Sequence, residues 1–132
     1  MDLEILKIAS HTENNKILPN HTHKSKNKNP LCGDEMEISL IVKNNKVLDM
    51  GYQCKSCVYC QASVSLLSQN IKDKNLDEIK DFIDTCENIF ENTKINLEKK
   101  WLSFKELFNK KNISRKECLL LPLRTVTKAL ND

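Results

Sequence analysis

The chain has 132 residues, of which 39% are hydrophobic and 30% are charged, so it fits one globular domain and is too apolar for wholesale disorder. Its formal net charge is only +3, and its one basic run, at 23–29, has no aromatic residue on which a base could stack, so nucleic-acid binding is not expected. No apolar run approaches the roughly 18 residues that span a bilayer, and the first residues lack the positive charge of a secretory signal. We therefore expect a cytoplasmic protein with no membrane association.

The first part of the chain is predicted to be a polar leader. Residues 3–9 have the spacing of a short amphipathic helix. The stretch 10–30 is rich in Asn, Lys and His, and we expect it to be extended or mobile, with a solvated loop at 23–29. The expected organisation is thus a leader at 1–29 and one compact domain at 30–132.

A β-hairpin is predicted directly after the leader. Apolar and polar residues alternate between Met36 and Val42, as in a half-buried strand. Asn44 and Asn45 suit a tight hairpin turn because Asn tolerates positive φ better than most residues. The return strand is expected over residues 47–52.

Helices are expected after the hairpin. Residues 62–71 predict a largely buried helix, and Asn75 begins the next one with a capping signal. Cys86 falls on the apolar stripe of that second helix, which assigns it to the core. A further amphipathic helix is predicted at 97–108, and a terminal helix with Pro122 in its first turn. Because strands precede helices, the predicted fold is α+β, a small antiparallel β-sheet with helices packed on one face in two layers.

Four side chains at the ends of these elements form a candidate metal site. Cys32 and Asp34 precede the first strand, while Cys57 and Cys118 stand at the starts of two helices. In a reducing cytosol, closely spaced thiols favour metal or redox chemistry over disulfides. The N-terminus of a helix favours the thiolate that binds metal or attacks sulfur. Three thiolates and a carboxylate suit zinc or an iron-sulfur cluster, and the spacing does not choose between them.

Three ordered motifs resemble the U-type iron-sulfur cluster assembly scaffold family. They are "NPLCGD" at 29–34, a cysteine (Cys57) five residues before "AS", and "RKECLLLP" at 115–122. The resemblance covers roughly residues 29–130 and implies a two-layer α+β fold. The site that it implies, for zinc or a nascent two-iron two-sulfide cluster, consists of Cys32, Asp34, Cys57 and Cys118.

The resemblance also implies how the site works. Sulfur would come from a cysteine desulfurase and be accepted by Cys57 and Cys118, and Cys32 would join them in holding iron. Asp34 would make binding labile, because a carboxylate is a harder ligand than a thiolate, so that the finished cluster passes to apo iron-sulfur proteins. The expected protein is a scaffold rather than an enzyme, and a homo-oligomer is a possible assembly.

Two departures from the family pattern keep alternatives open. Cys54 and Cys60 extend the middle motif to CxxCxxC, as alternative ligands, a sulfur-accepting pair or an oxidisable dithiol. Glu117 stands where one branch of the family has His and the zinc-binding branch has a basic residue. The second hypothesis is therefore a zinc-binding sulfur relay, a sulfurtransferase partner of a desulfurase. The third is an interaction module that structural zinc stabilises.

Overall fold

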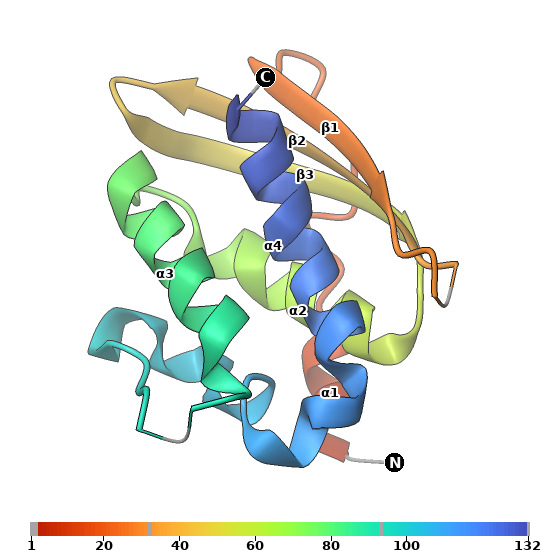
Figure 1. Ribbon diagram of the computed structural model, residues 1–132. Helices are drawn as coiled ribbons and strands as arrows, with labels where there is room; N and C mark the ends of the chain where they lie inside the picture. The colour runs from red at the N-terminus through yellow and green to blue at the C-terminus, as the bar shows by residue number, and fades with distance from the viewer. Residues whose placement is uncertain (1–2, 32, 93, 132) are drawn as a thin grey trace.

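The computed structural model describes residues 3–31, 33–92 and 94–131. Figure 1 shows how their helices and strands follow one another and how they are arranged in space. In chain order they are α1 (Leu3–Ala9), β1 (His23–Lys28), β2 (Glu35–Lys43), β3 (Lys46–Lys55), α2 (Val58–Asn70), α3 (Leu76–Ile89), the 3-10 helices η1 (Lys99–Glu106) and η2 (Lys110–Arg115), and α4 (Lys116–Asn131).

The three strands form one antiparallel sheet in the order β1-β2-β3. Met36, Ile38 and Leu40 of β2 are buried, which confirms the alternating strand. Asn44 and Asn45 both adopt positive φ, 54° and 64°, and so make the predicted tight turn between β2 and β3. The hairpin was therefore predicted correctly from local sequence alone.

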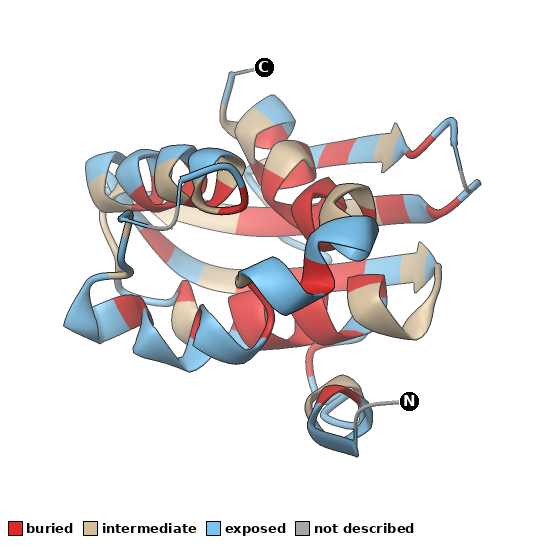
Figure 2. Ribbon diagram, turned by 60° about the horizontal axis from the view of Figure 1, so that its bottom comes forward, coloured by how far each residue is buried: buried red, intermediate tan, exposed pale blue. Residues whose placement is uncertain are grey.

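Helices α2 and α4 pack on one face of the sheet, and α3 lies beside α4 (Figure 1). The buried residues line the sides of helices and strands that face one another (Figure 2). This two-layer α+β arrangement confirms the predicted fold class. None of the described helices is both long and apolar enough to cross a membrane.

The other face of the sheet is partly covered by the segment 14–18 of the leader. The backbone N–H of Leu18 donates to the hydroxyl of Ser39 in β2 at 3.1 Å, and Ser39 is buried. At Gly51 of β3, a Cβ atom would lie 2.3 Å from the carbonyl oxygen of Lys16, so only glycine allows this close approach. The segment 14–18 is thus packed against the sheet.

The structure corrects the prediction for residues 23–29, because most of this stretch is strand β1 and not a solvated loop. Its side chains are polar but have partners on both sides of the strand. The buried hydroxyl of Ser25 donates to the carbonyl of Thr125 in α4 at 2.7 Å, while two lysines of β1 pair with Glu37 at 3.6 and 3.7 Å. Polar contacts therefore stabilise this strand. Strands are usually recognised in a sequence by alternating apolar and polar residues, and β1 has no apolar residue.

The helix predicted at 97–108 is also corrected, because the structure has the shorter 3-10 helix η1 there. Trp101, Phe104 and Leu107 are all buried, and their spacing of three residues matches the three-residue turn of a 3-10 helix. The ring of Phe82 in α3 stacks on Trp101 with centroids 4.2 Å apart. Cys86 of α3 is fully buried, as predicted for a core residue.

Helix α4 begins earlier than predicted, at Lys116, so Pro122 lies in its second turn and not its first. A proline inside a helix has no N–H to donate to the carbonyl four residues before it, here that of Cys118. Pro122 is itself buried. The helix therefore continues through the proline, with one backbone hydrogen bond fewer at its start.

Candidate metal centre

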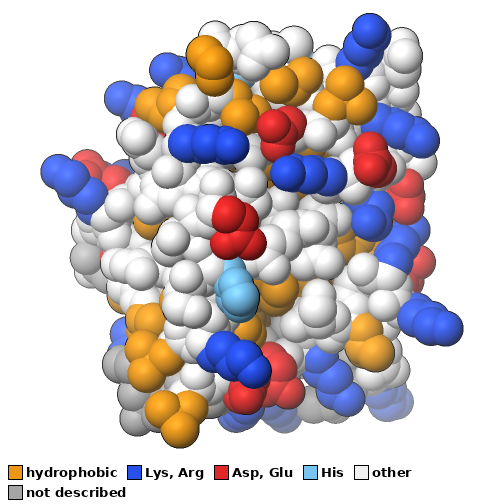
Figure 3. All heavy atoms as spheres, turned by 180° about the vertical axis from the view of Figure 1, so that it is seen from behind, with side chains coloured by type: hydrophobic (Ala, Val, Ile, Leu, Met, Phe, Trp, Pro, Cys, Tyr) orange, Lys and Arg blue, Asp and Glu red, His pale blue; other side chains and the backbone are white. Residues whose placement is uncertain are grey.

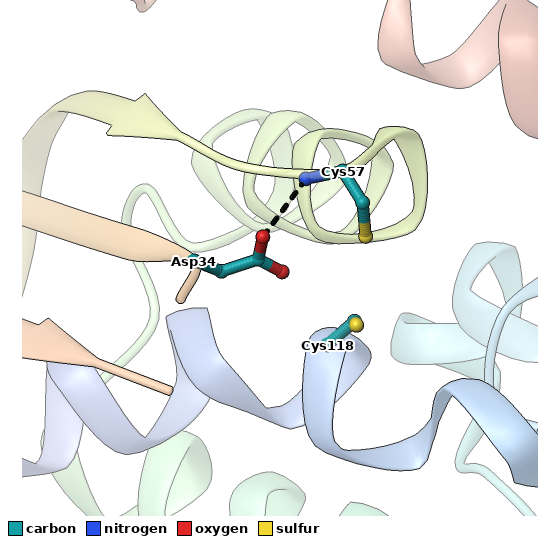
Figure 4. Close-up of side chains that lie close together, drawn as sticks. All are labelled: Asp34, Cys57 and Cys118. Atoms are coloured by element: carbon teal, nitrogen blue, oxygen red, sulfur yellow. Dashed lines mark hydrogen bonds between the residues drawn. The ribbon is translucent and has the colours of Figure 1, made fainter. Parts of the chain in front are cut away.

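Asp34, Cys57 and Cys118 meet at one end of the sheet (Figure 4). A carboxylate oxygen and the two sulfurs all lie within 4.8 Å of one another. In a tetrahedral zinc site, neighbouring ligand atoms lie roughly 3.3–3.8 Å apart, so these three need only small side-chain movements to bind one ion. The three side chains come from remote parts of the sequence, and they are three of the four ligands predicted from the sequence.

The turn before β2 fixes the position of Asp34. The side-chain oxygen of the buried Asn29 accepts a hydrogen bond from the N–H of Leu31 at 3.0 Å. The backbone of Asn29 also makes two hydrogen bonds across the turn. Its carbonyl accepts from the N–H of Gly33, and its N–H donates to the carbonyl of Asp34, each at 2.8 Å. Gly33 has a φ of 75°, which L side chains rarely adopt. The described residues of the "NPLCGD" motif therefore form a tight turn that delivers the carboxylate to the site.

The carboxylate of Asp34 is buried, with 7% of the residue exposed. One oxygen accepts a hydrogen bond from the N–H of Cys57 at 3.2 Å (Figure 4). The other oxygen has no hydrogen-bond partner within the described part of the chain. A buried acceptor without a partner costs about 1–3 kcal/mol, and a bound cation would satisfy it. Together with two sulfurs, this oxygen makes a donor set that fits zinc or iron.

Cys57 and Cys118 both occupy the beginning of a helix. Cys57 is the N-cap of α2 and is half-buried, and its side chain makes no capping hydrogen bond. The positive end of the helix dipole favours negative charge there, and Asp34 provides it through the hydrogen bond to the Cys57 N–H. Cys118 lies in the first turn of α4 and is buried, with its sulfur directed towards Cys57 (Figure 4).

Cys54 and Cys60 lie near the three ligands but outside their group. Cys54 is half-buried at the end of β3, and Cys60 is fully buried in the first turn of α2. Burial raises the pKa of both thiols, and the charges of Asp34 and Cys57 raise it further. Both thiols are therefore neutral in the absence of a cation. The roles considered for Cys54 and Cys60, as alternative ligands, sulfur acceptors or an oxidisable dithiol, remain predictions. Cys32, the fourth predicted ligand, lies outside the described residues.

A cluster of charges beside Cys118 was not anticipated from the sequence. Arg124 of α4 donates to both carboxylate oxygens of Glu87 in α3, at 3.1 and 2.8 Å, and also to the carboxylate of Glu117. Glu117 is thus engaged by Arg124. The spacing of seven residues between Glu117 and Arg124, two helical turns, was the one available sequence signal.

The surface opposite the view of Figure 1 carries no large patch of one charge. Lys and Arg side chains are interspersed there with Asp and Glu side chains (Figure 3). The charge on this face of the molecule is therefore mixed.

The sequence matches one family model and is similar to known proteins. The family model described as "NifU-like N terminal domain" matches residues 4–100. The chain is 31% identical over 104 residues to the iron-sulfur cluster assembly scaffold protein IscU of Thermotoga maritima, which covers 78% of this chain and 72% of that protein.

Two solved structures share the fold over nearly the whole chain. The N-terminal part of a nitrogen-fixing NifU-like protein from Brucella abortus aligns with a TM-score of 0.90 at 21% identity, covering 98% of this chain and 91% of that one. A putative iron-sulfur cluster assembly scaffold protein for the SUF system from Fervidobacterium islandicum aligns with a TM-score of 0.87 at 23% identity, covering 98% and 96%. At these identities, the likeness establishes the fold alone.

Proposed function

The chain belongs to the NifU-like N-terminal domain family, and on that premise we propose that it is a scaffold on which iron-sulfur clusters are assembled. The observation that carries the proposal is the convergence of Asp34, Cys57 and Cys118, with ligand atoms within 4.8 Å. These are three of the four residues that the sequence motifs single out. One buried carboxylate oxygen of Asp34 has no hydrogen-bond partner among the described residues, which supports a cation at this place.

The first step is the delivery of sulfur to the site. The thiolate of Cys57 attacks the outer sulfur of a persulfide on a cysteine desulfurase, forming a new S–S bond. The S–S bond of the donor breaks, and the donor cysteine leaves as a thiolate. Cys57 suits this step because it is half-buried, at the start of a helix that favours a thiolate. Cys118 is the second acceptor and is more buried than Cys57.

The second step is the holding and release of the cargo. An external two-electron reductant, a thiol or an electron-transfer protein, would first split the S–S bond of each cysteine persulfide, which releases sulfide and restores the thiolate. Cys32, Cys57 and Cys118 would then supply thiolates for a two-iron two-sulfide cluster, and Asp34 would supply one oxygen. A carboxylate binds iron less tightly than a thiolate does and exchanges more readily. Its second oxygen already accepts a hydrogen bond from the N–H of Cys57. This hydrogen bond would hold the Asp34 side chain in position when the cluster leaves for an apo-protein.

A zinc-binding sulfur relay is the second candidate, favoured by the residue before Cys118. Glu117 replaces the histidine of one branch of the family, and its carboxylate is engaged by Arg124. Zinc binds well to sites with several cysteines, and one thiolate could leave the zinc to accept sulfur. In this alternative the same cysteines act, but no cluster forms.

Purification without oxygen separates the two candidates. The full chain would be isolated anaerobically after expression with its natural desulfurase, and its iron, zinc and acid-labile sulfide would be measured with its visible absorption. The scaffold proposal predicts iron and sulfide in equal amounts and a coloured protein. Zinc without sulfide would refute the scaffold and leave the relay.

A further inference from the structure

The position of Cys118 depends on the first turn of α4. The 3-10 helix η2 runs directly into this turn, and the N–H of Lys116 donates to the carbonyl of Ile113. Pro122 has no N–H, so the helical hydrogen bond that would end on the carbonyl of Cys118 does not form. Contacts from outside the helix therefore contribute to holding this turn, and one of them is the hydrogen bond from the hydroxyl of Ser63 to the carbonyl of Leu119 at 2.7 Å.

Ion pairs with α3 and the residues after it supply such contacts. Arg124 holds both oxygens of Glu87 and also the carboxylate of Glu117, the residue next to Cys118. A second pair joins Lys116, the first residue of α4, to Glu91 at 3.0 Å. The start of α4 is thus tied to the end of α3 on both sides of Cys118.

We propose that Arg124 is a positioning residue that fixes the first turn of α4, and with it the sulfur of Cys118, at the metal centre. Arg124 itself is not a ligand. We call the contacts of Arg124 with Glu87 and Glu117 the clamp. The inference rests on the proposed function only in naming the metal centre, and the geometry of the clamp does not depend on that function.

The chemistry of Arg124 suits this task. The guanidinium group is planar and binds Glu87 with two parallel hydrogen bonds, which fixes direction as well as distance. Its hydrogen bonds to Glu87 raise the pKa of Arg124 above an already high ordinary value, so the guanidinium group is positively charged at neutral pH. The remaining nitrogen of the guanidinium group, Nη1, donates to Glu117, two turns earlier in α4. Arg124 therefore connects the first turn of α4 to Glu87 of α3.

The clamp also keeps the charge of Glu117 occupied. A free carboxylate next to Cys118 could compete for the metal or turn the helix start towards the site. With Arg124 between them, the carboxylates of Glu87 and Glu117 share one positive charge. The distinction between holding the helix and neutralising Glu117 can be tested with separate variants.

The competing explanation is that these are ordinary surface ion pairs. Arg124 and Glu87 have side chains that are 37% and 33% exposed, and such pairs contribute little to stability in most proteins. The chain offers a matched control in Lys100, which pairs with Glu78 at 2.6 Å, with side chains 36% and 28% exposed. That pair joins η1 to α3, away from the three ligands.

The test compares zinc affinity and local hydrogen exchange in the full chain. Arg124→Gln and Lys100→Gln would be titrated with zinc against a competing chelator, and amide exchange of residues 116–121 would be followed in the metal-free proteins. We expect Arg124→Gln to weaken zinc binding about tenfold, the lower end of the effect of residues that orient metal ligands, and to speed exchange in this turn. Arg124→Lys keeps the charge but loses the paired hydrogen bonds of the guanidinium group. Its zinc affinity and exchange rate should lie between those of the wild type and Arg124→Gln. Lys100→Gln should leave both readouts at the wild-type value.

Three results would overturn the inference. Equal zinc affinity in Arg124→Gln and wild type would show that the clamp does not act on the site. Unchanged exchange at 116–121 would show that it does not hold the turn, and this readout needs no metal. Full recovery of affinity in Arg124→Gln/Glu117→Gln would show that the freed charge, not helix position, caused the loss. Absence of zinc binding in the wild type would instead count against the proposed function, and exchange alone would then decide on the clamp.

Discussion

Replacing Asp34 with alanine should leave the metal-free protein as stable as the wild type or make it more stable. Asp34→Ala removes the hydrogen bond from the N–H of Cys57, which acts as a cap for α2. Losing a helix cap costs about 1 kcal/mol. The same change removes a buried carboxylate oxygen that has no partner in the described part of the chain, which relieves about 1–3 kcal/mol. The expected net change is a gain of about 0–2 kcal/mol.

The opposite result is expected for function. Without its one oxygen ligand, a reconstituted cluster should depend on thiolates alone and be released more slowly to an apo-protein. Asp34→Asn is the matched control, because its amide oxygen still accepts from Cys57 while the negative charge is lost. The assays are urea unfolding in the presence of a chelator and the decay of cluster absorption without oxygen.

Two outcomes would refute this reasoning about Asp34. A loss of about 1 kcal/mol or more in metal-free Asp34→Ala would show that removing the partnerless oxygen does not offset the loss of the cap, and that the carboxylate stabilises the fold. Equal or faster loss of the cluster in Asp34→Ala would show that the aspartate does not make the cargo labile.

Two further predictions follow from the fold. Chelation of metal should leave far-UV circular dichroism nearly unchanged, because a continuous apolar core lies between the sheet and helices independently of the site; cooperative unfolding on chelation would instead support a structural zinc module. Gly51→Ala should destabilise the protein by more than about 2 kcal/mol, since the new Cβ would lie 2.3 Å from the backbone of Lys16, whereas Gly33→Ala, with open space around its Cβ but a φ of 75°, should cost only about 1 kcal/mol. Thermal unfolding compares these variants, and equal melting temperatures for the two would contradict the packing of segment 14–18.

Local signals in the sequence were sufficient for some elements of the fold. The Asn44–Asn45 turn and the capping box at Asn75 depend on residues close in sequence, and the structure has both. Strand β1 was missed because its stabilising contacts are remote: Ser25 bonds to Thr125, a hundred residues away. Alternation of polar residues with polar residues carries no burial signal.

Periodicity misled the prediction in two other places. Over two turns, buried residues three apart fit an α-helix and a 3-10 helix equally well, so η1 was assigned the wrong type. Pro122 was placed in a first helical turn because proline is favoured there, but packing of the apolar residues around it carries α4 through the proline.

The sequence named the residues of the candidate metal centre, but it gave little indication of the contacts around them. Thiols at helix starts and the family motifs pointed to Asp34, Cys57 and Cys118, and the structure brings these three together. The pairing of Arg124 with Glu87 joins residues 37 positions apart on different helices, and no sequence pattern announces it. Such contacts become visible only when the relative position of α3 and α4 is known.

The convergence of the three ligands on one ion is tested most directly by X-ray absorption at the zinc edge of the zinc-loaded full chain. Compared with the wild type, the number of sulfur neighbours of the zinc should be lower by one in the single variant Cys57→Ser. It should likewise be lower by one in the single variant Cys118→Ser. Cys86→Ser, which alters a buried core cysteine outside the group of three ligands, should leave that number unchanged. An unaltered sulfur shell in either Cys57→Ser or Cys118→Ser would contradict the account.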